Sequence, residues 1–209
     1  MSPGAPARRS RAVGEEQKEA RRGQILLAAK KVFADRGFQA TTMSDVASAA
    51  GLSYGAVYWY FDSKEDLFHA LMDLEDAALR GRIARVLDGR ADQDPRESLR
   101  RAISATFEFF EEDKAAVKLL FRDSYALGGR FERHLFGIYE RFIDDLAALF
   151  GAAQRRGEII VVPPRVAAFS VAALVGQLAY RRLTTDDGLE APVVADFVIR
   201  LVMDGLRPR

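Results

Sequence analysis

The sequence contains no cysteine and only two histidines, His69 and His134, among its 209 residues. The missing thiols exclude disulfides, thiolate metal sites and a cysteine nucleophile. With so few imidazoles, any metal or acid–base site would consist mostly of carboxylates. The chain also lacks the zinc-protease pattern HExxH, a phosphate-binding Walker loop and a calcium-binding EF-hand loop. We therefore expect no catalytic residues, no metal and no cofactor.

Long apolar runs are missing as well. One of the two longest stretches without charge or proline is the 15 residues between Arg165 and Arg181, and it includes Ser170 and Gln177. It is too short and too polar to span a bilayer. The first 24 residues are polar and contain no apolar core of the kind that a signal peptide needs. These features predict a soluble, cytoplasmic protein that has no membrane partner.

The chain also lacks a large excess of either positive or negative charge, because it has 31 basic and 30 acidic residues. This balance excludes a uniformly basic nucleic-acid coat and an acidic tail. The distribution is uneven: residues 1–31 hold eight basic and three acidic residues, whereas residues 71–209 hold 21 and 22. Composition favours a disordered basic arm over residues 1–17. An arm that contacts phosphate is the more specific alternative.

Helical periodicity runs through the rest of the sequence. Apolar residues recur at spacings of three and four, and glycines or prolines separate the periodic segments. No segment shows the alternation of a strand. We expect an all-α fold of nine helices, the first ending at Gly37 and the others covering approximately residues 43–50, 54–60, 64–87, 95–110, 113–127, 131–156, 164–183 and 191–206.

The segment TMSDVASAAGLSYGAVYWYFDSK, residues 42–64, contains two short helices separated by Gly51-Leu52-Ser53. A three-residue turn with glycine is typical of a helix-turn-helix. Buried Val57 would close the second helix over the first, leaving its tyrosines outward, as a DNA recognition helix requires. The pattern G-x-S-x-G around Ser53 also matches the nucleophile elbow of serine hydrolases. That elbow needs a strand before the serine, and the sequence predicts a helix there.

Residues 22–71 resemble the DNA-binding domain of TetR/AcrR-family transcriptional regulators. The resemblance rests on Phe33-Ala-x-x-Gly37-Phe38, Thr41-Thr42-Met43-x-x-Val46-Ala47, Ala50-Gly51-Leu52-Ser53-x-Gly55 and Val57-Tyr58-x-Tyr60-Phe61-x-Ser63-Lys64-Glu65-x-Leu67. Tyr60 departs from the histidine that many members carry there. The resemblance implies a nine-helix architecture with a helix-turn-helix domain over residues 18–80 and a ligand-binding and dimerisation domain over residues 81–209.

The resemblance also implies roles for individual residues. Thr42 would hold a phosphate through its hydroxyl and backbone N–H, and the start of the recognition helix would face base edges. Each role has a plainer alternative: Thr42 and Ser53 are helix caps in any case, Trp59 could be partly core, and Lys64 could be a solvated lysine. Val57, Phe61 and Leu67 are expected in the core. The predicted DNA contacts are Thr42, Ser53, Tyr54, Gly55, Ala56, Tyr58, Trp59, Tyr60 and Lys64.

The second half of the chain is rich in aromatic residues, with nine between Phe107 and Phe142. Any one of them is explained by an ordinary core, but together they exceed what the core of a small bundle needs. The resemblance implies a mostly apolar pocket for a small hydrophobic effector within this bundle. The predicted pocket residues are Phe107, Phe110, Phe121, Tyr125, Phe131, Phe136, Tyr139, Phe169, Gln177 and Tyr180, with His134 and Arg122 as weaker candidates.

The last two expected helices carry an apolar stripe and a run of small residues. Both could be internal core, but together they resemble the four-helix dimer interface of the family. The predicted interface residues are Ala172, Gly176, Val194, Phe197, Val198 and Leu201. A homodimer would present two recognition helices to a palindromic operator in double-stranded DNA. We expect a repressor that a ligand releases from DNA; a helical protein–protein adaptor and a hydrolase using Ser53 are the alternatives.

Overall fold

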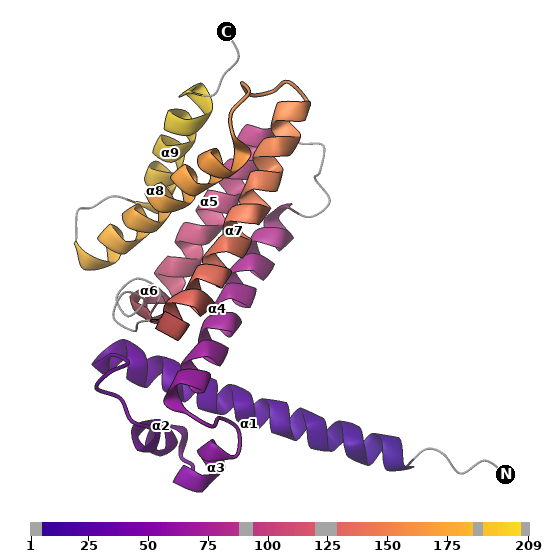
Figure 1. The fold of residues 1–209 in the computed structure, drawn as a ribbon, viewed down its shortest axis with the longest axis vertical. Coiled ribbons are helices and arrows are strands. Elements are labelled where there is room, and N and C mark those ends of the chain that lie inside the picture. Colours follow the sequence, from indigo (N-terminus) through magenta and orange to yellow (C-terminus); the bar gives the residue numbers. More distant parts are fainter. Residues whose placement is uncertain (1–5, 88–93, 120–128, 186–189, 206–209) are drawn as a thin grey trace, which may run out of the picture. The chain divides into compact units, whose positions relative to one another are not determined.

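The computed structural model describes residues 6–87, 94–119, 129–185 and 190–205. In these ranges every regular element is a helix, which confirms the all-α prediction. None of these helices is long and apolar enough to cross a membrane. The helices are α1 (Pro6–Arg36), α2 (Met43–Ala50), α3 (Tyr54–Tyr58), α4 (Lys64–Leu87), α5 (Pro95–Glu112), α6 (Lys114–Lys118), α7 (Gly129–Arg155), α8 (Pro164–Thr184) and α9 (Ala191–Gly205) (Figure 1).

The chain divides into two compact units, residues 1–71 and residues 72–209. The division falls inside α4, between Leu71 and Met72, whereas the sequence analysis placed it after residue 80. Helix α4 continues without a glycine or proline at this point, so the sequence gives no stop signal at the division.

The first unit has its core under α1, α2, α3 and the start of α4. Ile25, Leu26 and Phe33 of α1 are fully buried. Phe33, Phe38 and Phe68 form a three-ring cluster with centroids 5.2–5.5 Å apart. The expected core positions Val57, Phe61 and Leu67 are buried, as predicted. This core holds the short helices α2 and α3, which could not be stable in isolation.

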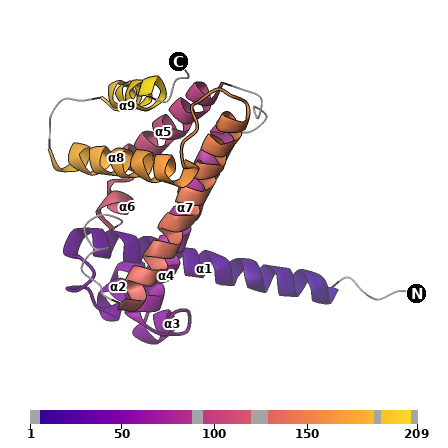
Figure 2. The same cartoon turned by 45° about the horizontal axis from the view of Figure 1, so that its top comes forward.

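The second unit packs α7 against α8 and α5 against α9 (Figure 2). Its core contains Phe107 and Phe110 of α5, Ile143 of α7, Val175 of α8 and Val198 of α9. Helix α5 begins at Pro95, as expected, with the Asp94 side chain accepting a hydrogen bond from the Arg96 backbone N–H. Pro164 likewise occupies the first turn of α8, where proline costs no intrahelical hydrogen bond.

Three boundaries differ from those expected. Residues 6–17 belong to α1, so the predicted disordered arm is wrong over that range; residues 1–5 lie outside the described residues. Helix α3 ends at Tyr58 instead of Tyr60. Of the helix expected over residues 113–127, α6 accounts for Lys114–Lys118, and residues 120–127 are outside the described part. The arm was misjudged because alanine, arginine and glutamate favour helix even without an apolar stripe.

Candidate functional site

Helix α2 begins with a capping box built from Thr42 and Asp45. The Asp45 backbone N–H donates to Thr42 Oγ1 at 3.2 Å, and the Thr42 backbone N–H donates to Asp45 Oδ2 at 2.8 Å. The Thr42 hydroxyl also donates to Asp45 Oδ2, at 2.6 Å. Both donors that Thr42 was predicted to offer a phosphate are therefore engaged by a carboxylate. The structure supports the alternative that Thr42 is a helix cap.

Asp45 is charged and held in place. Arg36 Nη1 lies 2.9 Å from Asp45 Oδ1. The hydrogen bonds from Thr42, and the nearby Arg36 guanidinium, hold the pKa of the Asp45 carboxyl below its usual range. The carboxylate thus links the end of α1 to the start of α2 and fixes the orientation of the first helix of the motif.

The turn between α2 and α3 depends on Gly51. Its φ of 66° lies in the left-handed region, where a side chain would be strained. The backbone N–H of Leu52 then donates to the Ala47 carbonyl at 2.9 Å, closing the end of α2. Ser53 caps α3, since its Oγ accepts a hydrogen bond from the Ala56 backbone N–H at 3.2 Å. A helix therefore precedes Ser53, and the strand-to-helix elbow of a serine hydrolase does not exist here.

The outer face of α3 carries exposed aromatic side chains. Tyr54 is 54% exposed and Trp59, just after the helix, is 67% exposed. Tyr58 is also exposed, and its ring centroid lies 4.5 Å from that of Tyr54. A hydrogen bond with Tyr54 raises the pKa of Tyr58, so its phenol stays neutral near pH 7. The prediction that these tyrosines face outward is confirmed, and Trp59 is not a core residue.

The remaining predicted contacts on α3 are smaller. Ser53 and Gly55 are exposed, whereas Ala56 and Tyr60 are partly buried. A side chain at Gly55 would meet no atom within 4 Å, so the fold itself does not require glycine at this position. A surface without a side chain lets another molecule come close to the helix backbone. The Tyr60 ring meets the Trp59 ring edge-on, with centroids 4.7 Å apart.

Lys64 has a structural role that the sequence analysis missed. Its ammonium donates to the carbonyls of Phe38 at 2.8 Å and of Gln39 at 3.4 Å. It also lies 4.4 Å from the centroid of the Phe38 ring. It is therefore not a purely solvated lysine. It joins the start of α4 to the loop after α1.

A second cation, Lys18 of α1, was not among the predicted contacts. Its ammonium lies 5.3 Å from the centroid of the Trp59 ring. The helical residues before Gly23 therefore extend α1 alongside the exposed aromatic surface of the motif. Only the basic composition of this segment hinted at the contact, because the partners Lys18 and Trp59 lie far apart in the sequence.

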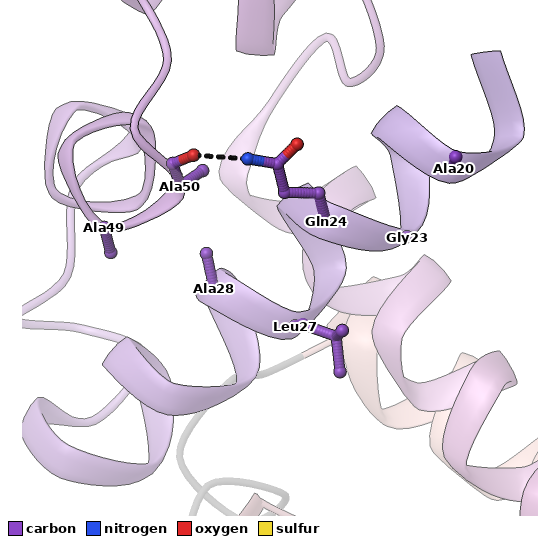
Figure 3. Close-up of a pocket in the computed structure, with 7 residues that line it drawn as sticks. All are labelled: Ala20, Gly23, Gln24, Leu27, Ala28, Ala49 and Ala50. Atoms are coloured by element: carbon purple, nitrogen blue, oxygen red, sulfur yellow. Dashed lines mark hydrogen bonds between the residues drawn. The ribbon is translucent and has the colours of Figure 1, made fainter. Parts of the chain in front are cut away.

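The first unit also has a hollow between α1 and α2, of about 560 Å³ and open to solvent (Figure 3). Gln24 closes one side, with its Nε2 donating to the Ala50 carbonyl at 2.7 Å. The residues that line it are Ala20, Gly23, Gln24, Leu27, Ala28, Ala49 and Ala50. None is charged, so this hollow has nothing with which to bind phosphate.

The predicted ligand pocket is found only in part. Phe107 and Phe110 are buried and line a cavity of about 310 Å³, together with Glu111, Lys114, Ala179 and Arg182. Among the described residues, none of the other predicted ones lines it. Phe136, Phe169 and Gln177 are exposed, so their assignment to a pocket wall is wrong in this structure. Their spacing could not reveal which side of each helix faces the core.

The other pocket predictions have mixed outcomes. Tyr139 is partly buried and packs edge-on against Phe169, with centroids 6.0 Å apart. Tyr180 is partly buried too. Phe121, Arg122 and Tyr125 lie outside the described residues, as does the side chain of Phe131. The weaker candidate His134 instead lies 3.2 Å from Asp73 of α4, as measured from Nε2 to Oδ1.

The predicted interface residues fall into two groups. Val194 and Val198 of α9 and Ala172 of α8 are buried in the core of the same chain. Gly176 is partly buried. Phe197 and Leu201 are 59% and 56% exposed, and Val193 lies one turn before them with 57% exposed. We call Val193, Phe197 and Leu201 the α9 outer face.

Helix α8 has a comparable outer side. Val166 and Phe169 are 61% and 55% exposed, and Ala173 continues the same line one turn later. An apolar row on each of two adjacent helices is larger than the scattered exposed residues of an ordinary surface. Half of the residues predicted for the interface are buried in the core of the chain, and the others leave the interface a prediction.

Two family models match the chain. Residues 25–71 match "Bacterial regulatory proteins, tetR family", and residues 92–206 match "Tetracyclin repressor-like, C-terminal domain". The first match includes α2, α3 and the Gly51 turn, and the second includes α5, α6, α8 and the cavity. Together they cover both compact units.

Curated relatives and solved structures agree with these matches. The transcriptional activator FasR of Mycolicibacterium smegmatis is 36% identical over 57% of this chain and 54% of its own length. The match thus spans about half of that relative. The transcriptional repressor BepR of Brucella suis is 29% identical over 96% of both chains.

Among solved structures, PfmR of Thermus thermophilus is 26% identical, with a TM-score of 0.70 over 88% of this chain and 99% of its own. FadR of Bacillus halodurans has a TM-score of 0.79 over 90% and 97%, at 20% identity, and shares the fold. The helix-turn-helix geometry, the helical second unit and the matches to both halves lead to one assignment: this chain belongs to the tetR family of bacterial transcriptional regulators.

Proposed function

We propose that this protein binds double-stranded DNA through α2 and α3 and regulates transcription in response to a small molecule. The observation that carries the proposal is the outer face of α3. A five-residue helix held by a buried Val57 exposes two tyrosines, and the Trp59 indole that follows the helix is exposed as well. A recognition helix in the major groove uses such a surface.

The contacts divide by position along the motif. Tyr54 and Gly55 lie in the first turn of α3, the part of a recognition helix that reaches base edges. Tyr58 and Trp59 lie at its end, where a neutral hydroxyl and an indole N–H can donate to phosphate oxygens. Lys18 adds a positive charge beside Trp59. Thr42 and Lys64 support the motif from within and take no direct part.

We further propose that the protein acts as a homodimer through the α9 outer face and the neighbouring outer side of α8. Two-fold symmetry would bring the same apolar rows of two copies together and remove them from water. Burying the exposed part of Phe197 and Leu201 in this way contributes roughly 1–2 kcal/mol for each side chain, a little over half of the value for complete burial. A dimer presents two copies of α3, so the operator would be a palindrome.

The regulatory step follows from linkage. A ligand lowers the affinity for DNA only if it binds more tightly to a conformation that cannot bind DNA. Helix α4 is continuous across the division between the two units, so it is the element through which the ligand unit can act on the DNA-binding unit. We propose release from the operator on ligand binding, which is the behaviour of a repressor.

The test is selection of binding sites from random duplex DNA, followed by footprinting of the enriched sequence. We expect a protected palindrome. Tyr54→Ala should weaken the selected site by about 1–3 kcal/mol and relax the preference at one position in each half-site. Phe136→Ala is the matched control, because it removes an equally exposed aromatic ring from the second unit. A random pool that yields no enriched sequence, or equal effects of the two variants, would contradict the proposal.

A further inference from the structure

The cavity between α5, α6 and α8 has two cationic side chains at its wall. Lys114 and Arg182 each carry a positive charge, and Glu111 is the one acidic residue that lines it. The rest of the lining is apolar: the Phe107 and Phe110 rings and Ala179. The described lining is therefore positive by one charge beside two aromatic rings, which is not the environment of a purely hydrophobic ligand.

The Arg182 guanidinium is only partly satisfied. Its Nη2 pairs with Glu111 Oε1. Its Nε and Nη1 are closed off from solvent and have no hydrogen-bond partner in the described part of the chain. The side chain as a whole is 17% exposed. Nε and Nη1 together carry three N–H groups, and buried charged donors without acceptors are rare because they forgo the hydrogen bonds that water would supply.

We propose that this cavity binds an organic anion, with its charged head at Arg182 and Lys114 and its apolar part against Phe107 and Phe110. The inference rests on the proposed function, since it names the chemical class of the effector. A carboxylate can accept from Nε or from Nη1, which donate on opposite edges of the guanidinium, and charge-assisted hydrogen bonds to guanidinium are among the strongest in proteins. The volume of about 310 Å³ is at the lower end for ligand sites, so the ligand is small.

Glu111 is a built-in competitor for the same guanidinium. Its side chain is 43% exposed, so it does not depend on Arg182 to be charged and solvated. An anion that enters the cavity competes with Glu111 for Arg182 and is repelled by its charge. Neutralising Glu111 should consequently strengthen anion binding, whereas neutralising either cation should weaken it.

Octanoate, octanamide and octyl phosphate, titrated calorimetrically into the full-length chain, provide the first test. The acid and the amide have the same chain and nearly the same shape, so their difference reports the charge. We expect octanoate to bind at least about tenfold more tightly than octanamide, the effect of one charge-assisted hydrogen bond. Octyl phosphate identifies the anionic group. If octyl phosphate binds more tightly than octanoate, the ligand is phosphorylated, and if octanoate binds more tightly, the ligand is a carboxylic acid.

Variants of the lining give the second test. Arg182→Met should weaken octanoate binding about tenfold or more and leave octanamide unchanged. Glu111→Gln should strengthen octanoate binding. Arg165→Met is the matched control, because it removes an α8 arginine that pairs with Glu140 and Asp144 instead. If Arg182→Met does not fold, Lys114→Gln carries the same expectation from an exposed position.

Equal affinities for octanoate and octanamide, no binding of either anion, or equal effects of Arg182→Met and Arg165→Met would overturn the inference. Binding of the chain to its selected operator without ligand is measured separately. If the chain binds no operator DNA, the proposed function is contradicted but the anion site is not. Normal operator binding without preference for the anion contradicts the anion site alone.

Discussion

Replacing Lys64 with methionine separates the two roles considered for this residue. Methionine keeps most of the apolar stem but removes the ammonium that bonds the Phe38 and Gln39 carbonyls and lies over the Phe38 ring. If Lys64 supports the fold, the variant loses stability. If it contacts phosphate, the variant loses DNA affinity at all sequences and part of its salt dependence.

The loss of stability can be worked out from the contacts. The bond to Phe38 at 2.8 Å is short, whereas that to Gln39 at 3.4 Å is long enough to neglect. A hydrogen bond from a partly exposed cation contributes about 1.5 kcal/mol, at the lower end of the range for charged groups. The cation–π contact adds about 0.5 kcal/mol. The first unit should therefore lose about 2 kcal/mol of its free energy of unfolding.

Urea denaturation measured by tryptophan fluorescence provides the assay. Trp59 is the only tryptophan in the chain and belongs to the first unit, so its emission reports that unit. Lys31→Met, at an exposed position of α1, is the control and should change the unfolding free energy by less than about 0.5 kcal/mol. Unchanged stability, combined with a salt slope lower by about one, would refute the structural role of Lys64.

The remaining predictions concern the cap and the dimer. Thr42→Ala should cost about 1 kcal/mol in the same assay, because it removes the capping box. Because the pKa of the Asp45 carboxyl is depressed in the folded chain, its contribution to stability is complete above its unfolded pKa and is lost as the pH falls through its folded pKa. In Asp45→Asn, the free energy of unfolding should therefore fall less steeply as the pH is lowered through this range. Phe197→Asp should give a folded monomer in sedimentation, whereas Val198→Asp, which buries a carboxylate in the core, should unfold the second unit. A folded monomer from Val198→Asp, or a dimer of unchanged mass from Phe197→Asp, would place the interface elsewhere.

Helix caps, helix ends and core positions of the first unit could be predicted from the sequence, because each depends on residues only a few positions apart. Thr42 and Ser53 were recognised as caps, Gly51 as a helix stop, and Val57 and Phe61 as core, and the structure has them so. These assignments depend on backbone geometry within one turn of helix, which the residue type largely determines. The ordered series of such signals between Phe33 and Leu67 was also enough to identify the family.

Only the tertiary structure decided which side of a helix faces the core and which partner a charged side chain chooses. Val198 and Phe197 are neighbours of similar hydrophobicity, yet one is completely buried and the other is exposed. The partners of Lys64 lie 25 and 26 residues away, and Glu111 lies 71 residues from Arg182. Pairs this far apart meet only after the helices have packed, and packing depends on the shapes of whole surfaces and not on a local pattern. For that reason the roles of Lys64 and Arg182 belong to the fold and not to any motif.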